Sequence, residues 1–306
     1  MNWQLVPQFA ATGLLNGGPI ALVALGIVLI FKASYLFNFA QGQLLLLGTL
    51  LTWWLSELGW PLWGAIVGAM VAAALLGVAI ERVALRPMTN QPLLPIVLMT
   101  LALSQILQGI ALLFFGNQSK SFPRIFAAEN PYKVTTPFTN KAGGNIIIIL
   151  QQNLVWSSLV ALAAVIIIGA FFRFTRTGLA MRAASEDHEL AQSIGLSIKR
   201  IFALSWALSS VVATLGGILL ATASGLDFSL AYVVLTAFPV VLLGGLDSIP
   251  GTIVGGLLIG LGQGLVKAST VPLVKNSAEI LPYLILLVVL LIRPTGIFGQ
   301  RHVERV

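Results

Sequence analysis

Long runs of apolar residues without a single acidic or basic side chain divide this sequence, and they constrain its fold more than any motif does. A helix needs about 20 mostly apolar residues to cross the ~30 Å hydrocarbon core of a bilayer. Charged residues make up 9% of the chain and hydrophobic residues 58%, whereas soluble domains carry about 25% charged residues. Because a segment in lipid must satisfy its own backbone hydrogen bonds, the sequence predicts an all-α, polytopic membrane protein.

The charge-free runs predict eight or nine transmembrane helices within one transmembrane domain that covers residues 1–306. The predicted spans are Phe9–Phe31, Leu44–Ser56, Pro61–Ile80, Leu94–Phe115, Ile146–Phe172, Ile201–Thr222, Phe228–Gly245, Gly251–Ala268 and Ile280–Ile292. The last of these is short unless it begins before Glu279. We interpret the first run as a span and not as a cleaved signal peptide, because the first 31 residues carry no charged side chain.

The distribution of basic residues predicts the orientation of these spans. With the N-terminus outside, 11 bases fall on the inner side: Lys32, Arg82, Arg86, Arg173, Arg176, Arg182, Lys199, Arg200, Arg293, Arg301 and Arg305. Six fall outside: Lys120, Arg124, Lys133, Lys141, Lys267 and Lys275. Cytoplasmic loops carry the excess of Lys and Arg. We therefore expect the N-terminus outside and the C-terminus in the cytoplasm, with a cytoplasmic loop at 173–200 and an external loop at 117–145.

The cytoplasmic loop at 173–200 contains a short predicted helix. Ser185 has the chemistry of an N-cap and Gly195 that of a helix stop, so we expect a helix over Glu186–Ile194. Leu190, Ala191 and Ile194 share one face of it. A helix of about nine residues is marginal alone in water, so it requires a docking partner or rests on the lipid headgroups. The residues predicted to make this contact are Arg182, Glu186, Asp187, Leu190, Ala191, Ile194 and Gly195.

Two segments place polar or helix-breaking residues between apolar runs: Asn38–Gly42 and Leu243–Gly256. Each is either a broken helix beside a pathway, where irregular backbone is tolerated at membrane depth, or a tight turn at the membrane surface. The neutral polar residues Asn38, Gln41, Gln43 and Gln105 are candidates for lining a pathway. For each of them, an interhelical hydrogen bond is the alternative role. A neutral lining suits a neutral or zwitterionic solute better than an ion.

A stripe of glycines recurs at near four-residue spacing through one predicted span: Gly251, Gly255, Gly256, Gly260 and Gly264. Small residues at this spacing allow another helix to approach closely. The stripe predicts either packing within this chain or contact with a second transmembrane subunit.

Several kinds of chemistry are not supported by the sequence. The chain has no cysteine and two histidines, and it lacks HExxH, GxSxG and the nucleotide-binding pattern GxxxxGKS/T. We therefore expect no enzyme activity, no metal site and no cofactor on this chain. The apolar runs have no acidic residue at their centres, which counts against a proton-driven secondary transporter. Basic residues cluster at the ends of spans, as in membrane orientation and not in nucleic-acid binding.

Three stretches together carry a family resemblance: LFNFAQGQLLLLG at 36–48, RAASEDHELAQSIGLSIKRIFALSW at 182–206, and VLLGGLDSIPGTIVGGLLIG at 241–260. With ERVALRPM at 81–88, the chain resembles the LivH-type permeases of bacterial branched-chain amino acid ABC importers. The likeness covers nearly the whole chain. Two positions depart from the family pattern, because Gln43 stands where the family often has Glu and Asp247 where it has Gly.

The resemblance implies a permease of the bacterial inner membrane that works with four kinds of partner. These are membrane lipid, a second, LivM-like permease, two cytoplasmic ATPases that hold ATP and magnesium, and a periplasmic substrate-binding protein. It also implies that Glu186–Ile194 is the helix that couples the permease to the ATPases. Two other functions remain open: a urea or short-amide ABC permease, and an ion-coupled secondary transporter.

Overall fold

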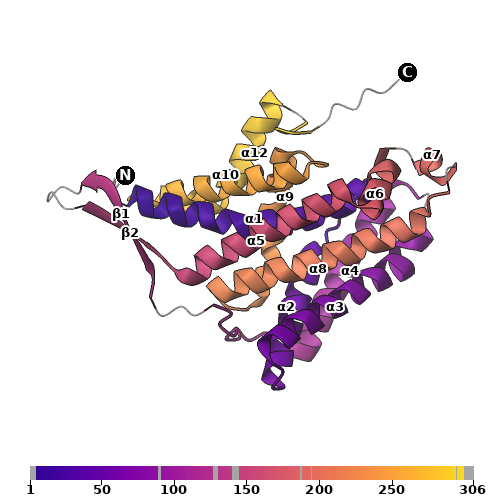
Figure 1. Ribbon diagram of the computed structural model, residues 1–306, viewed down its shortest axis with the longest axis horizontal. Coiled ribbons are helices and arrows are strands. Elements are labelled where there is room, and N and C mark those ends of the chain that lie inside the picture. Colours follow the sequence, from indigo (N-terminus) through magenta and orange to yellow (C-terminus); the bar gives the residue numbers. More distant parts are fainter. Residues whose placement is uncertain are drawn as a thin grey trace.

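A computed structural model shows a bundle of long helices with a small β-hairpin at one end (Figure 1). The structure describes residues 5–88, 91–126, 130–139, 145–186, 188–193, 195–293 and 295–299. The first half contains α1 (Val6–Ser34), α2 (Gln41–Glu57), α3 (Leu62–Ile80), η1 (Glu81–Leu85), η2 (Arg86–Met88), α4 (Leu93–Phe115), β1 (Tyr132–Thr139) and β2 (Asn145–Leu150). The second half contains α5 (Gln152–Phe174), α6 (Arg176–Glu186), α7 (His188–Ser193), α8 (Ile198–Ser224), η3 (Phe228–Tyr232), α9 (Val233–Gly244), α10 (Ile249–Lys267), α11 (Pro272–Asn276), η4 (Ser277–Glu279) and α12 (Leu281–Ile292).

Six of the described helices are long and apolar enough to cross a membrane, which supports a multi-pass membrane protein. They are α1, α3 with its extension to Met88, α4, α5, α8 and α10. A pair bent by 70°, Pro272–Glu279 with Leu281–Ile292, brings the number to seven if it forms one span. The prediction of eight or nine spans is therefore not confirmed. It counted α2, which has 17 residues, and the short apolar helix Phe228–Gly244, and both fall below the length of about 20 residues that a full span needs.

Helix α1 forms the centre of the bundle. It packs against α5, α8, α9 and α10, and every residue from Ala21 to Ile30 is buried. A helix that is apolar on all sides buries its whole circumference in protein or lipid, and here neighbouring helices cover it. In Figure 1, α1 lies between α10 and α5.

The two ends of the bundle differ in their chemistry. At the end where β1 and β2 lie, on the left of Figure 1, α1 begins and α10 ends. At the opposite end α6 and α7 lie beside the end of α5 and the start of α8, and this end carries Lys32, Arg173, Arg176, Lys199 and Arg200. We call these the hairpin end and the basic end.

The β-hairpin is a departure from an all-α fold, and it corrects the predicted start of a span at Ile146. Strand β2 contains four consecutive isoleucines and pairs antiparallel with β1, so that Thr135 faces Ile147 and Tyr132 faces Leu150. A run of β-branched residues favours a strand, and the helix begins only after it, at Gln152. The Gln8 amide fastens the hairpin to α1, because its Nε2 donates to the Ile149 carbonyl at 2.6 Å and its Oε1 accepts from the Ile149 N–H at 2.7 Å.

The glycine stripe of α10 faces other helices of the same chain. A Cβ atom on Gly260 would lie 2.4 Å from the Gly13 carbonyl oxygen, and one on Gly264 would lie 2.2 Å from the Phe9 carbonyl oxygen. Gly256 meets Ala21 in the same way, whereas Gly251 and Gly255 face Gly244 and Val240 of α9. The stripe thus brings α10 into backbone contact with α1 and α9.

Candidate functional site

The first broken segment, Asn38–Gly42, lies inside the protein and not at its surface. Helix α1 ends at Ser34, and Tyr35 takes a left-handed conformation with φ 55°, donating its N–H to the Phe31 carbonyl. The chain then turns back along α1, and α2 begins at Gln41 beside Gly26. Gly26 precedes the end of α1 by eight residues, which corresponds to about 12 Å of helix. The break therefore lies inside the helix bundle and not at its surface.

Polar side chains in this break satisfy one another. The Asn38 amide donates to Gln41 Oε1 at 3.0 Å, and Asn38 Oδ1 accepts from the Ala40 N–H at 2.9 Å. On α8, the Ser209 hydroxyl lies 2.7 Å from the Gly26 carbonyl oxygen and 3.0 Å from Gln41 Oε1. Asn38, Gln41 and Ser209 are at most 1% exposed. This network joins α1, α2 and α8. Asn38 and Gln41 thus take part in interhelical hydrogen bonding, which was the alternative to lining a pathway.

The other two pathway candidates lie outside this network. Gln43, one residue beyond Gly42 on α2, is 7% exposed, and its Oε1 has no hydrogen-bond partner. Gln105 lies on α4 with its side chain exposed. Of the four candidates, the hydrogen bonds of the described residues therefore unite only Asn38 and Gln41.

The second broken segment forms a tight turn at the basic end. Helix α9 ends at Gly244 and is followed by Gly245, with φ 103°, and Ser248 caps α10 by accepting from the Gly251 N–H at 3.0 Å. The Asp247 carbonyl accepts a hydrogen bond from Lys32 Nζ at 3.1 Å. This contact holds the turn against the end of α1.

The helix predicted at Glu186–Ile194 with Ser185 as its cap differs from what forms. Ser185 lies inside α6, and its hydroxyl donates to the Arg182 carbonyl at 2.7 Å. Thr175 is the cap of α6 instead, because its extended backbone lets Oγ1 accept from the Gly178 N–H at 3.0 Å. Sequence reasoning missed this cap, although a Thr followed by the helix-compatible residues Arg176–Glu186 is a usable signal. Helix α7 then covers only His188–Ser193.

The predicted contact residues of this segment do not share one environment. Ala191 is 2% exposed, whereas Leu190 is 63% exposed, so of these two described residues Leu190 presents its apolar side chain outward and Ala191 does not. Gly195 ends α7 as predicted, with φ 85° and its N–H bonded to the Gln192 carbonyl. Arg182 lies on α6 with its Nη2 3.4 Å from the Arg173 carbonyl. Asp187, Ile194 and the Glu186 side chain lie outside what the structure describes.

Tyr35 connects the first broken segment with α6. Its hydroxyl donates a hydrogen bond to the Ser185 carbonyl, in the last turn of α6. The residue that directly follows α1, three positions before the broken segment, is thus bonded to α6, which precedes α7.

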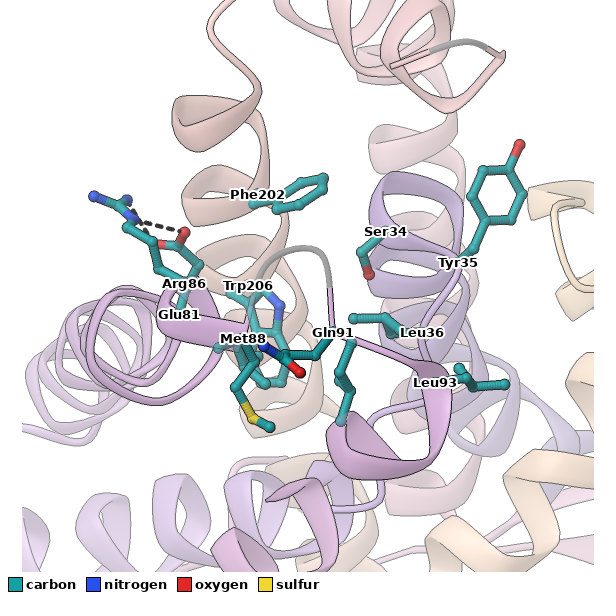
Figure 2. Close-up of a pocket in the computed structure, with 12 residues that line it drawn as sticks. Ser34, Tyr35, Leu36, Glu81, Arg86, Met88, Gln91, Leu93, Phe202 and Trp206 are labelled. Carbon is teal, nitrogen blue, oxygen red and sulfur yellow. Dashed lines mark hydrogen bonds and ion pairs between the residues drawn. The ribbon is translucent and has the colours of Figure 1, made fainter. Parts of the chain in front are cut away.

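A pocket of about 320 Å³ opens beside Tyr35 at the basic end (Figure 2). Its lining residues come from the end of α1, from η1 and η2, from the start of α4 and from α8: Ser34, Tyr35, Leu36, Glu81, Leu85, Arg86, Met88, Gln91, Leu93, Ile96, Phe202 and Trp206. In Figure 2 the Glu81 and Arg86 pair lies on one side, with Ser34 and Leu36 on the other. None of these residues was a predicted site residue, although the motif at 81–88 contains several of them.

An ion pair forms the charged side of this pocket. Arg86 Nη2 lies 2.8 Å from Glu81 Oε2, and Arg86 Nε lies 3.1 Å from Glu81 Oε1. The Glu81 side chain is 3% exposed and that of Arg86 34%. Residues five apart are separated by about 140° around an α-helix, but Glu81–Leu85 forms a π-helix, whose i to i+5 bonding brings them together.

The described side chains do not suggest a metal centre. Among residues whose positions the structure gives, no three His, Asp or Glu side chains are grouped so that they could hold a metal ion. The described lining of the pocket therefore offers the Glu81 and Arg86 ion pair, neutral polar groups and apolar side chains.

Comparisons with known proteins agree with this architecture. The family described as the branched-chain amino acid transport system permease component matches residues 9–291. The high-affinity branched-chain amino acid transport permease protein LivH of Escherichia coli K12 is 30% identical over 305 residues, which cover 96% of each chain. The corresponding protein BraD of Pseudomonas aeruginosa is 26% identical, covering 98% of this chain and 97% of the relative.

A solved structure supports the fold at lower sequence similarity. PsaBC from Streptococcus pneumoniae, in complex with Fab, contains a chain that superposes with a TM-score of 0.51 at 16% identity. The match covers 94% of this chain and 92% of that one. With the family match over most of the sequence, the conclusion about ancestry is direct: this chain belongs to the family of branched-chain amino acid transport system permease components.

Proposed function

We propose that this chain is the permease subunit of an ATP-driven importer that moves neutral, branched-chain amino acids into the cytoplasm. The family match over residues 9–291 carries the proposal. In this proposal the chain pairs with a second permease, receives substrate from a periplasmic binding protein, and is driven by two cytoplasmic ATPases. The sequence has no nucleotide-binding motif of its own, so ATP and magnesium would bind to the ATPases.

The proposed orientation places the basic end in the cytoplasm of a bacterial cell, with the N-terminus outside. The excess of basic residues at that end supports it. The ATPases would then meet α6 and α7, where Leu190 offers an exposed apolar side chain. Arg173, Arg176 and Lys199 surround this contact in sequence and supply positive charge.

Coupling would pass from α7 through α6 to the first broken segment. The Tyr35 hydrogen bond to Ser185 supports this route, because it joins α6 to the backbone just after α1. An ATPase dimer that favours one arrangement of α6 and α7 would bias the permease between inward-open and outward-open states. Bistable packing of α1 against α2 and α8 would then alternate access for the solute.

The test is ATP-driven uptake by the reconstituted importer. The permease is assembled with its permease partner, the ATPases and the binding protein in proteoliposomes, and labelled leucine uptake is measured with and without ATP. We expect uptake that requires ATP and survives ionophores that collapse proton and sodium gradients. Ion-dependent uptake without ATP, or competition by urea but not by isoleucine, would contradict the proposal.

A single substitution in α7 tests the proposed docking of the ATPases. Leu190→Asp should reduce retention of the ATPases roughly tenfold or more, because a charge replaces an apolar contact at an interface. Leu190 is exposed, so folding should change little. Leu273→Asp is the matched control, since Leu273 is 82% exposed but lies on α11 next to the hairpin end. Equal ATPase retention by the two variants would show that α7 is not the docking site.

A further inference from the structure

The pocket at the basic end combines a charged wall with an apolar interior. Glu81 and Arg86 supply one carboxylate and one guanidinium at 2.8 Å from each other. Leu85, Ile96 and Trp206, each at most 8% exposed, supply apolar surface. Small-molecule sites share this composition, which is mostly apolar with a few placed polar groups. A volume of 320 Å³ lies at the lower end of the range of about 300–1,000 Å³ for such sites.

The ion pair is unusual in where and how it is held. A carboxylate that is 97% removed from solvent is costly to bury even when it is paired, so stability alone is a weak reason for its presence. The π-helix that aligns the pair is also costly and rare, and such turns occur frequently at functional sites. The buried carboxylate and the π-helix that aligns it with Arg86 therefore point to a role for this pair beyond folding.

The chemistry of the pocket matches a zwitterionic α-amino acid with an aliphatic side chain. A guanidinium binds a carboxylate through paired hydrogen bonds, and a carboxylate accepts hydrogen bonds from an ammonium group. Arg86 and Glu81 together would therefore hold the two charged groups of one amino acid. Trp206 and Met88 line the same pocket as the pair, so an aliphatic side chain in the pocket would contact them.

We infer that this pocket is an exit-side binding site for the transported amino acid, occupied on the cytoplasmic face of the permease. The inference rests on the proposed function and goes beyond it by placing substrate at Glu81, Arg86 and Trp206. Tyr35, which lines the pocket, is hydrogen-bonded to Ser185 of α6. The state of the coupling segment would thereby affect the site from which the solute leaves.

The experiment measures binding of labelled leucine to the assembled importer in nanodiscs, without binding protein or ATP. We expect competition by isoleucine, and competition at least tenfold weaker by isoamylamine and by 4-methylpentanoate, which each lack one of the two charged groups. The double variant E81Q/R86Q should lower leucine affinity at least tenfold. Arg82→Gln is the matched control, because Arg82 belongs to the same π-helix but is exposed, and its affinity should equal that of the wild type.

A second variant keeps the ion pair and so tests the site even if the double variant does not fold. Leu93 lines the pocket and is 59% exposed, so Leu93→Trp should obstruct the pocket from its rim and also lower leucine affinity at least tenfold. Wild-type affinity in Leu93→Trp would overturn the inference. If the wild-type importer takes up leucine with ATP but does not bind leucine here, the exit site is wrong and the proposed function stands. Absence of uptake by the wild type would overturn the proposed function.

A phospholipid headgroup with an ammonium and a phosphate has the same pair of charges. The binding assay is therefore run in nanodiscs with and without phosphatidylethanolamine. We expect the same leucine affinity in both. Leucine binding that disappears when phosphatidylethanolamine is present would assign the pocket to a lipid and overturn the inference.

Discussion

Substituting Gly260 by alanine should separate α1 from α10 and destabilise the bundle. A Cβ at this position would lie 2.4 Å from the Gly13 carbonyl oxygen and 2.8 Å from Gly17 Cα, both of which are backbone atoms. Ordinary contact begins near 3.4 Å, so the two helices must move apart by about 1 Å. Forcing an extra methyl group into such a contact costs about 1–3 kcal/mol.

Two other glycines provide matched controls for this effect. Gly262, on the same helix, would place its Cβ 3.0 Å from Leu281 Cδ2 and 3.2 Å from Ile285 Cδ1. These are ends of flexible side chains that can rotate away. Gly109 in α4 has no atom within 4 Å of the added Cβ, so Gly109→Ala should stabilise the helix by about 0.5–1 kcal/mol through its better helix propensity.

The assay is thermal unfolding in detergent, followed by the loss of the monodisperse peak in size-exclusion chromatography. A change of 1 kcal/mol shifts the Tm of a larger domain by about 2–4 °C. We therefore expect Gly260→Ala to unfold several degrees below the wild type, Gly262→Ala close to it and Gly109→Ala slightly above it. If Gly260→Ala were as stable as Gly109→Ala, the close approach of α1 and α10 would be refuted.

Two further substitutions test the first broken segment. Gln41→Leu removes the acceptor of Asn38 Nδ2 and a partner of Ser209, so it should lower stability by about 1–3 kcal/mol for the buried donor left unsatisfied. Gln43→Leu is the control, because Gln43 Oε1 has no partner to lose, and it should lower the Tm less. A larger loss of Tm in Gln43→Leu than in Gln41→Leu would contradict the network. Tyr35→Phe removes the hydroxyl bonded to Ser185, so ATP hydrolysis by the reconstituted importer should continue while leucine uptake per ATP falls severalfold. Unchanged uptake per ATP would exclude this hydrogen bond from coupling.

Local patterns in the sequence predicted a helix well where an apolar run long enough to cross a membrane is bounded by proline or glycine. The run predicted at Leu94–Phe115 forms α4 over Leu93–Phe115, because Pro92 precedes it and Gly116, with φ 68°, follows. Gly195 likewise ends its helix as predicted. The prediction of a span starting at Ile146 was wrong. A run of isoleucines is equally hydrophobic in a strand and in a transmembrane helix, and the pairing with β1 is what makes this run a strand.

Tertiary contacts decided what local patterns left open. The sequence could not place the break at Asn38–Gly42 at the surface or at depth, since the polar residues suit both. Its place inside the bundle follows from contact between Gln41, Ser209 and Gly26, which are distant in sequence. The Glu81 and Arg86 ion pair could not be predicted from the sequence either, because side chains five residues apart do not meet on the α-helix that the apolar run predicts. The two side chains meet because Glu81–Leu85 forms a π-helix.

The short segment that starts at Tyr35 is fixed on both sides of the break, and this arrangement suits it to a part in the proposed alternating access. Tyr35 is bonded through its N–H to α1 and through its hydroxyl to α6. Six residues later Gln41 is bonded to α8. In the proposed importer, movement of α6 by a bound ATPase would therefore stretch the segment, break one of these bonds or carry α1 and α2 along. Since a buried network that loses one member leaves its partners unsatisfied, the last of these is the response that the network favours.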